Sequence, residues 1–146
     1  MKLRHSSLAL LVLTSLASLA CHANDADCGM ISIFESGSVT IDLFPADIDA
    51  INGENQTHRT EFPVRAGTYE LKVYERIYSP DVMVSPRRRG FSKKLVVDVQ
   101  AGKRYEVGAQ FNRDKKTNPK EFWDPVVWKV GDLKAPCKAM SISPKS

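Results

Sequence analysis

Short runs of alternating apolar and polar residues recur from residue 30 onward, and this pattern limits the fold more than any other feature of the chain. In "TYELKVYERI", Tyr69, Leu71 and Val73 share one face of a strand, because successive strand side chains point to opposite faces. Five other segments alternate in the same way: "MISIF" (30–34), "VTIDLF" (39–44), "KLVVDV" (94–99), "RYEVGAQF" (104–111) and "PVVWKV" (125–130). A sheet with one apolar face needs a second layer to cover it.

Residues typical of turns separate these segments. Pairs that favour turns are Asn52-Gly53, Ala66-Gly67, Ala101-Gly102 and Asn118-Pro119. Short strands punctuated by turns are typical of a β-sandwich or a small barrel. The sequence therefore predicts an all-β domain of about seven strands with little helix.

Three segments in order, "VTIDLFPADIDAINGEN", "FPVRAGTYELKV" and "LVVDVQAGKRYEV", resemble the PEGA-type and related immunoglobulin-like domains of bacterial envelope proteins. The resemblance covers about residues 38–111. The chain departs from the pattern in that Asn52 stands where Asp is usual, Arg65-Ala66-Gly67 replaces Pro-Gly, and an insertion runs from Tyr78 to Gly90. The resemblance implies a single immunoglobulin-like β-sandwich that serves as an accessory module, and it names no catalytic residue.

The first 23 residues have the pattern of a signal peptide. A positively charged start (Lys2, Arg4) precedes an apolar run, Leu8 to Leu19, which is shorter than the roughly 20 residues of a membrane span. A signal-peptide cleavage site needs a small residue, any residue and a small residue, and Cys21-His22-Ala23 fits this pattern. We therefore expect a signal peptide at 1–23 and a mature β-sandwich domain at 24–146. No transmembrane segment is expected, and the predicted location is periplasmic or secreted.

Cys21 leaves a second possibility open, in which it carries a lipid and the protein is an outer-membrane lipoprotein. Ser18 stands where lipoprotein signals prefer a branched aliphatic residue, and Leu19 where a small residue is commoner. We therefore favour removal of Cys21 with the signal peptide.

Either outcome leaves Cys28 and Cys137 as an even pair. In an oxidising compartment such a pair predicts one disulfide, which here closes a loop of about 109 residues and ties the ends of the domain together. A catalytic or metal role for the pair is disfavoured, since the chain has no CxxC motif.

Candidate catalytic and metal-binding residues are few. His58 is the one histidine of the mature chain and has no acid–base partner nearby in sequence, and no GxSxG motif occurs. One histidine and a disulfide leave too few soft ligands for zinc. The segment with Asp47 and Asp49 fails the register of a calcium loop, because position 5 is Ile51. We therefore expect no enzyme activity, no cofactor and no metal.

The most distinctive segment is "RIYSPDVMVSPRRRGFSKK" (76–94). A long loop between two strands is often functional. Its basic residues are candidate contacts for an anionic partner: Arg87, Arg88, Arg89, Lys93 and Lys94. The alternative is a solvated loop tip that discourages edge pairing.

Without Lys2 and Arg4 the net charge falls to about +2, and we expect no nucleic-acid partner.

The segment "FWDPVVWK" is a second candidate surface. Trp128 alternates with Val126 and Val130 and is expected in the core. Trp123, beside Asp124-Pro125 near a strand entry, is a candidate aromatic surface, but core packing is the favoured account of it.

Together these features predict an exported, non-catalytic accessory or binding protein of the bacterial cell envelope. Its partner is an unknown protein or an anionic envelope component. The alternative is a periplasmic inhibitor or immunity protein that plugs a partner enzyme with the basic 78–94 loop.

Overall fold

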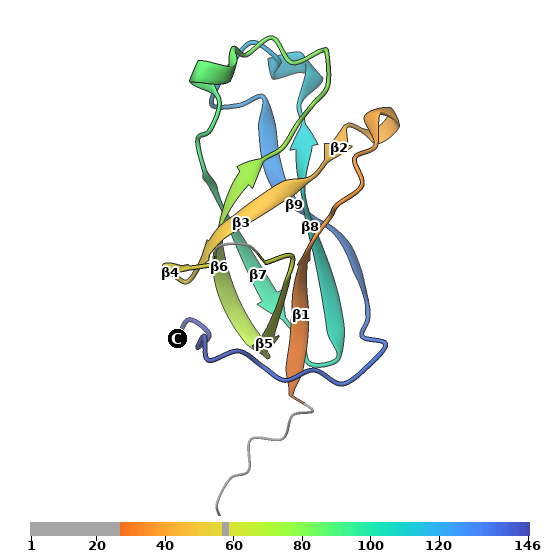
Figure 1. Cartoon of the computed structure of the whole chain (residues 1–146), viewed down its shortest axis with the longest axis vertical. Helices are drawn as coiled ribbons and strands as arrows, with labels where there is room; N and C mark the ends of the chain where they lie inside the picture. The colour runs from red at the N-terminus through yellow and green to blue at the C-terminus, as the bar shows by residue number, and fades with distance from the viewer. Residues whose placement is uncertain (1–26, 57–58) are drawn as a thin grey trace, which may run out of the picture.

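The computed structural model describes residues 27–56 and 59–146, which form a sandwich of two sheets (Figure 1). The predicted signal peptide, Cys21, the expected start near Asn24 and His58 lie outside the described residues. The described strands are β1 (Cys28–Ile33), β2 (Leu43–Phe44), β3 (Ala46–Ile51), β4 (Glu54–Asn55), β5 (Glu61–Arg65), β6 (Gly67–Glu75), β7 (Lys93–Val99), β8 (Lys103–Phe111) and β9 (Trp123–Asp132). Three short 3-10 helices accompany them: η1 (Val39–Ile41), η2 (Pro86–Arg88) and η3 (Arg113–Lys115). The predicted all-β sandwich is confirmed.

The two sheets differ in how their strands are ordered. One sheet has the order β2–β8–β1–β5, with β9 paired to the other side of β8, and the second sheet has the order β4–β3–β6–β7. β1 and β8 are parallel, and the other strand pairs described are antiparallel. Among the described strands the chain passes from one sheet to the other four times, after β2, β4, β5 and β7, so each sheet contains strands that are distant in sequence.

The core lies between the sheets and follows the predicted alternation. Tyr69, Leu71 and Val73 of β6 are buried, while the side chain of Lys72 between them is exposed. The inward residues of β8 are buried in the same way: Tyr105, Val107, Ala109 and Phe111. Burial of such side chains stabilises a domain by about 1.5 to 3 kcal/mol each.

The prediction of one strand over residues 39–44 is wrong in its first half. Val39 and Ile41 lie in η1 and are exposed, and only Leu43 and Phe44 form a strand. The reason is a turn at Asp42, whose φ of 55° is in the left-handed region. The backbone N–H of Leu43 donates to the carbonyl of Ser38 at 3.1 Å, which closes this turn.

The last residues, 133–146, form what we call the C-terminal strap, which crosses the lower end of the sandwich in Figure 1. The predicted disulfide is present: Cys137 of the strap is bonded to Cys28 of β1, with 6.0 Å between their Cα atoms. Ile142 is buried in the main core, and the N–H of Lys145 donates to the carbonyl of Thr68 at 2.8 Å. The strap therefore links both sheets.

None of the helices in the described part of the chain has the length and apolar character needed to cross a membrane.

Candidate partner-binding loop end

The loop between β6 and β7 (76–92) and the segment between β8 and β9 (112–122) lie together at the end of the sandwich opposite the C-terminal strap (Figure 1). We call these two segments the loop end. They are joined through the backbone, because the N–H of Met83 donates to the carbonyl of Lys116 at 3.1 Å. Ile77, Ser79 and Val84 are buried, so the β6–β7 loop packs against the sandwich at several points.

Arg89, one of the five predicted contact residues, is used inside the protein. Its guanidinium donates to the carboxylate of Glu75 at 2.9 Å (Nε to Oε1) and 2.7 Å (Nη2 to Oε2), and also to the carbonyl of Ile77. The Glu75 side chain is 4% exposed, and the guanidinium carbon of Arg89 lies 5.7 Å from the ring centre of Phe122. Arg89 therefore holds the loop onto the end of β6.

Lys93 and Lys94, at the start of β7, also have internal partners. Lys93 Nζ lies 2.8 Å from Asp124 Oδ1 and donates to the carbonyl of Trp123. Burial raises the pKa of Asp124, but hydrogen bonds from Lys93 and Asn112 outweigh burial and hold this pKa below its ordinary value. Lys94 is mostly exposed, with Nζ 3.0 Å from Glu70.

Arg87 and Arg88 differ from the other three. Both lie in η2, which begins at Pro86 and is exposed to solvent. Neither side chain has a hydrogen bond or an ion pair with another described residue. The structure thus divides the predicted basic cluster into three internally paired residues and two that face solvent.

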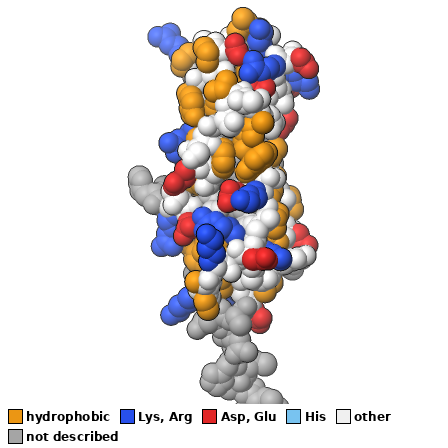
Figure 2. All heavy atoms as spheres, turned by 90° about the vertical axis from the view of Figure 1, so that its right-hand side faces the viewer, with side chains coloured by type: hydrophobic (Ala, Val, Ile, Leu, Met, Phe, Trp, Pro, Cys, Tyr) orange, Lys and Arg blue, Asp and Glu red, His pale blue; other side chains and the backbone are white. Residues whose placement is uncertain are grey.

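Large apolar side chains are exposed around these arginines. Met83 is 62% exposed and Phe91 54%, and Tyr78 is exposed while its ring meets that of Phe44 edge-on at 5.2 Å. Figure 2 shows apolar and basic side chains mixed at this end of the molecule.

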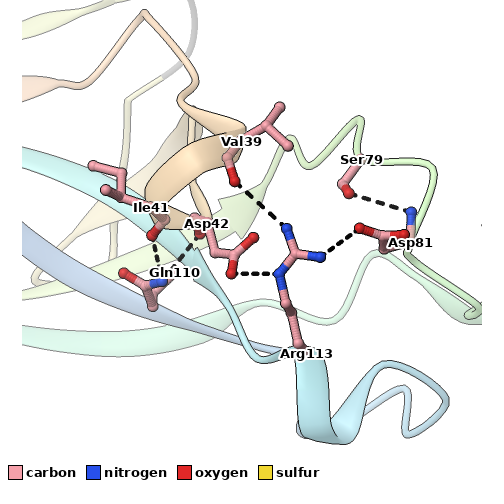
Figure 3. Close-up of polar contacts among 7 residues, drawn as sticks. All are labelled: Val39, Ile41, Asp42, Ser79, Asp81, Gln110 and Arg113. Carbon is pink, nitrogen blue, oxygen red and sulfur yellow. Dashed lines mark hydrogen bonds and ion pairs between the residues drawn. The ribbon is translucent and has the colours of Figure 1, made fainter.

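Arg113 of η3 holds three segments of this end together (Figure 3). Its guanidinium lies 2.6 Å from Asp42 Oδ2 and 2.6 Å from Asp81 Oδ2, which connects the turn after η1 with the β6–β7 loop. These hydrogen bonds raise the pKa of Arg113, so it stays charged. The sequence does not single out Arg113, because its partners are 71 and 32 residues away and no local pattern indicates them.

The structure places one tryptophan as expected and one against the prediction. Trp123 is 1% exposed, as core packing predicts, so it offers no aromatic surface. Trp128 is 45% exposed, and its predicted place in the core is wrong. Trp123 and Trp128 are five residues apart, so they lie on opposite faces of β9. Trp123 and Val127 pair with Phe111 and Val107, which are inward residues of β8, and Trp128 therefore lies on the other face. A β-bulge follows at Trp128, where Val107 pairs with Val127 while Glu106 pairs with Lys129.

Asp47 and Asp49, the residues of the rejected calcium loop, have basic partners. Arg76 Nη1 lies 3.1 Å from Asp47 Oδ1, and Lys72 Nζ lies 2.9 Å from Asp49 Oδ2. Both carboxylates are balanced by neighbouring cations on the surface of the second sheet.

Comparison with protein-family models, with curated proteins and with solved structures found no match to this chain. The resemblance to PEGA-type domains therefore stays a prediction.

Proposed function

We propose that the protein is an exported, non-catalytic binding protein of the bacterial cell envelope that engages an anionic partner through the loop end. One observation carries this proposal. Arg87 and Arg88 are adjacent, exposed and free of partners among the described residues, on a loop that the neighbouring Arg89 fixes to the sandwich.

The attachment of the loop supports a binding role. Arg89 binds Glu75, Arg113 binds Asp81, and Val84 is buried, so the exposed residues between these points have defined positions. A preorganised loop loses less conformational entropy when it binds than a flexible one.

The distribution of charge supports an anionic partner. The loop end holds eight Lys and Arg residues against three Asp and Glu residues, whereas the rest of residues 24–146 holds eleven against fourteen. Arg76, Arg89 and Arg113 are paired with carboxylates outside these segments, at Asp47, Glu75 and Asp42. The positive charge available to a partner therefore comes from Arg87, Arg88, Lys116 and Lys120, and a concentrated charge of one sign attracts ligands of the opposite sign.

A second candidate is an inhibitor or immunity protein that inserts the same loop into an acidic cleft of a partner enzyme. The attachment of the loop by Arg89 favours this candidate too, because an inserted loop has to keep its shape.

Affinity capture from an envelope extract tests the proposal. We expect the wild type to retain at least one component that an Arg87→Ser/Arg88→Ser variant does not retain. A Lys134→Ser/Lys138→Ser variant is the matched control, because it loses the same charge from exposed positions of the C-terminal strap. Equal capture by all three proteins contradicts the proposal. If the retained component is an enzyme that the wild type inhibits, the inhibitor is the correct candidate.

A further inference from the structure

We infer that the anionic partner is the headgroup surface of a phospholipid membrane, on which the loop end docks with Met83 and Phe91 in the interface. This inference rests on the proposed function and names its partner.

Exposed apolar and basic side chains occur together at the loop end. Met83 and Phe91 flank Arg87 and Arg88 in the same loop, and all four are exposed. Proteins that lie on membranes combine apolar side chains, which enter the headgroup boundary, with cations that attract anionic lipids. Long basic side chains suit this position because their stems contact apolar groups while their charges stay at the headgroups.

The segment between β8 and β9 adds lysines to the loop end. The bond between Met83 N–H and the Lys116 carbonyl places the β8–β9 segment beside Met83. Lys116 and Lys120 have no side-chain partner among the described residues, and Lys115 lies 3.6 Å from Glu121. Lysine is depleted at the centre of protein–protein interfaces, whereas an anionic membrane surface attracts lysine and arginine alike. The lysines therefore favour a membrane over an acidic protein.

The position of the loop end also suits contact with a flat membrane surface. The loop end lies at one end of the long axis of the molecule, and the sheets run away from it (Figure 1). A plane can therefore touch both loops at once, with the sandwich standing away from the membrane. The Arg113 bonds to Asp42 and Asp81 keep the two segments in register for such contact (Figure 3).

Flotation with lipid vesicles tests the inference. The purified exported protein is mixed with vesicles of phosphatidylglycerol and phosphatidylcholine, or of phosphatidylcholine alone, at low and high salt. We expect binding to the anionic vesicles only. We expect Arg87→Ser/Arg88→Ser to weaken it by roughly tenfold or more, since each basic residue near an anionic surface contributes to binding. Lys134→Ser/Lys138→Ser, which removes the same charge from the opposite end, should bind like the wild type.

A Met83→Ser/Phe91→Ser variant tests the apolar part of the contact. We expect it to lose the portion of vesicle binding that persists at high salt, because salt screens exposed charges and leaves apolar contacts in place. Thermal melting monitors folding, and a Met83→Gln/Phe91→Gln variant replaces it if the serine variant melts early.

Three results overturn the inference. The first is no binding to anionic vesicles, and the second is an equal loss of vesicle binding in the Lys134→Ser/Lys138→Ser variant, which reports net charge alone. The third is envelope capture that soluble polyglutamate abolishes and Met83→Ser/Phe91→Ser leaves unchanged, which indicates an acidic protein as the partner. If vesicles are not bound while envelope capture still depends on Arg87 and Arg88, the proposed function stands and only the membrane is excluded.

Discussion

The guanidinium of Arg89 forms two hydrogen bonds with the carboxylate of Glu75, which is almost fully buried at the end of β6. This pair separates the function of Arg89 from that of its neighbours Arg87 and Arg88, although the three are consecutive in sequence. It also makes the position of the loop depend on a buried charge.

Replacement of Arg89 should therefore destabilise the protein, whereas replacement of Arg88 should not. Arg89→Ala leaves the Glu75 carboxylate buried without its partner, and we expect a loss of about 2 to 4 kcal/mol in the free energy of unfolding. Arg88→Ala changes an exposed side chain and should alter it by less than about 0.5 kcal/mol. Urea denaturation of both variants measures the difference. Equal stability of the two variants contradicts the structural role of Arg89.

Loss of the Cys28–Cys137 disulfide should lower the free energy of unfolding by a few kcal/mol. The bridge closes a loop of 109 residues, and on the chain-entropy model a loop near this size contributes about 4.7 kcal/mol. Cys28→Ser/Cys137→Ser compared with the oxidised wild type in urea gives the value. Two free thiols detected by labelling the folded, oxidised protein argue against the bridge.

The two tryptophans should respond differently to truncation. Trp123→Ala removes a buried side chain, and we expect it to cost about 3 to 5 kcal/mol of stability. Trp128→Ala removes an exposed side chain and should cost much less. Fluorescence provides a second measurement, because the remaining Trp123 of the Trp128→Ala variant should emit as a buried indole. Emission typical of a solvent-exposed indole in that variant contradicts the arrangement.

Acid should loosen the C-terminal strap. Hydrogen bonds from Lys145 and Lys94 lower the pKa of Glu70, and the hydrogen bond from Lys103 lowers that of Asp132. A carboxyl whose pKa is lower in the folded state stabilises the fold above its unfolded pKa of about 4, and this stabilisation disappears as the pH falls through the folded pKa. Intrinsic amide exchange slows with acid, so the quantity to compare is the protection factor, which removes that dependence. We expect the protection factor of the Lys145 amide to fall below about pH 4 in the wild type. In Glu70→Gln this fall should be weaker, and an unchanged pH profile in that variant excludes Glu70 as the cause.

Several features of the fold were predictable because they depend on local order. Tyr69, Leu71 and Val73 are buried as the alternation predicts, since side chains of a strand repeat every two residues whatever the strand pairs with. The disulfide was predictable because Cys28 and Cys137 are the pair left when Cys21 is assigned to the expected signal peptide or to a lipid anchor.

Other features depended on contacts between distant residues, and the sequence contains no local sign of them. The left-handed backbone of Asp42 interrupts the strand predicted at 39–44, and the register of β9 against β8 decides that Trp123 and not Trp128 faces the core. Ion pairing also decided which basic residues of the loop end face solvent, because Arg89 reaches a carboxylate 14 residues away and Arg113 reaches two on separate segments. Alternation within a strand is set by the geometry of the backbone, whereas the partner of a charge or the site of a bulge is set by how the strands come together.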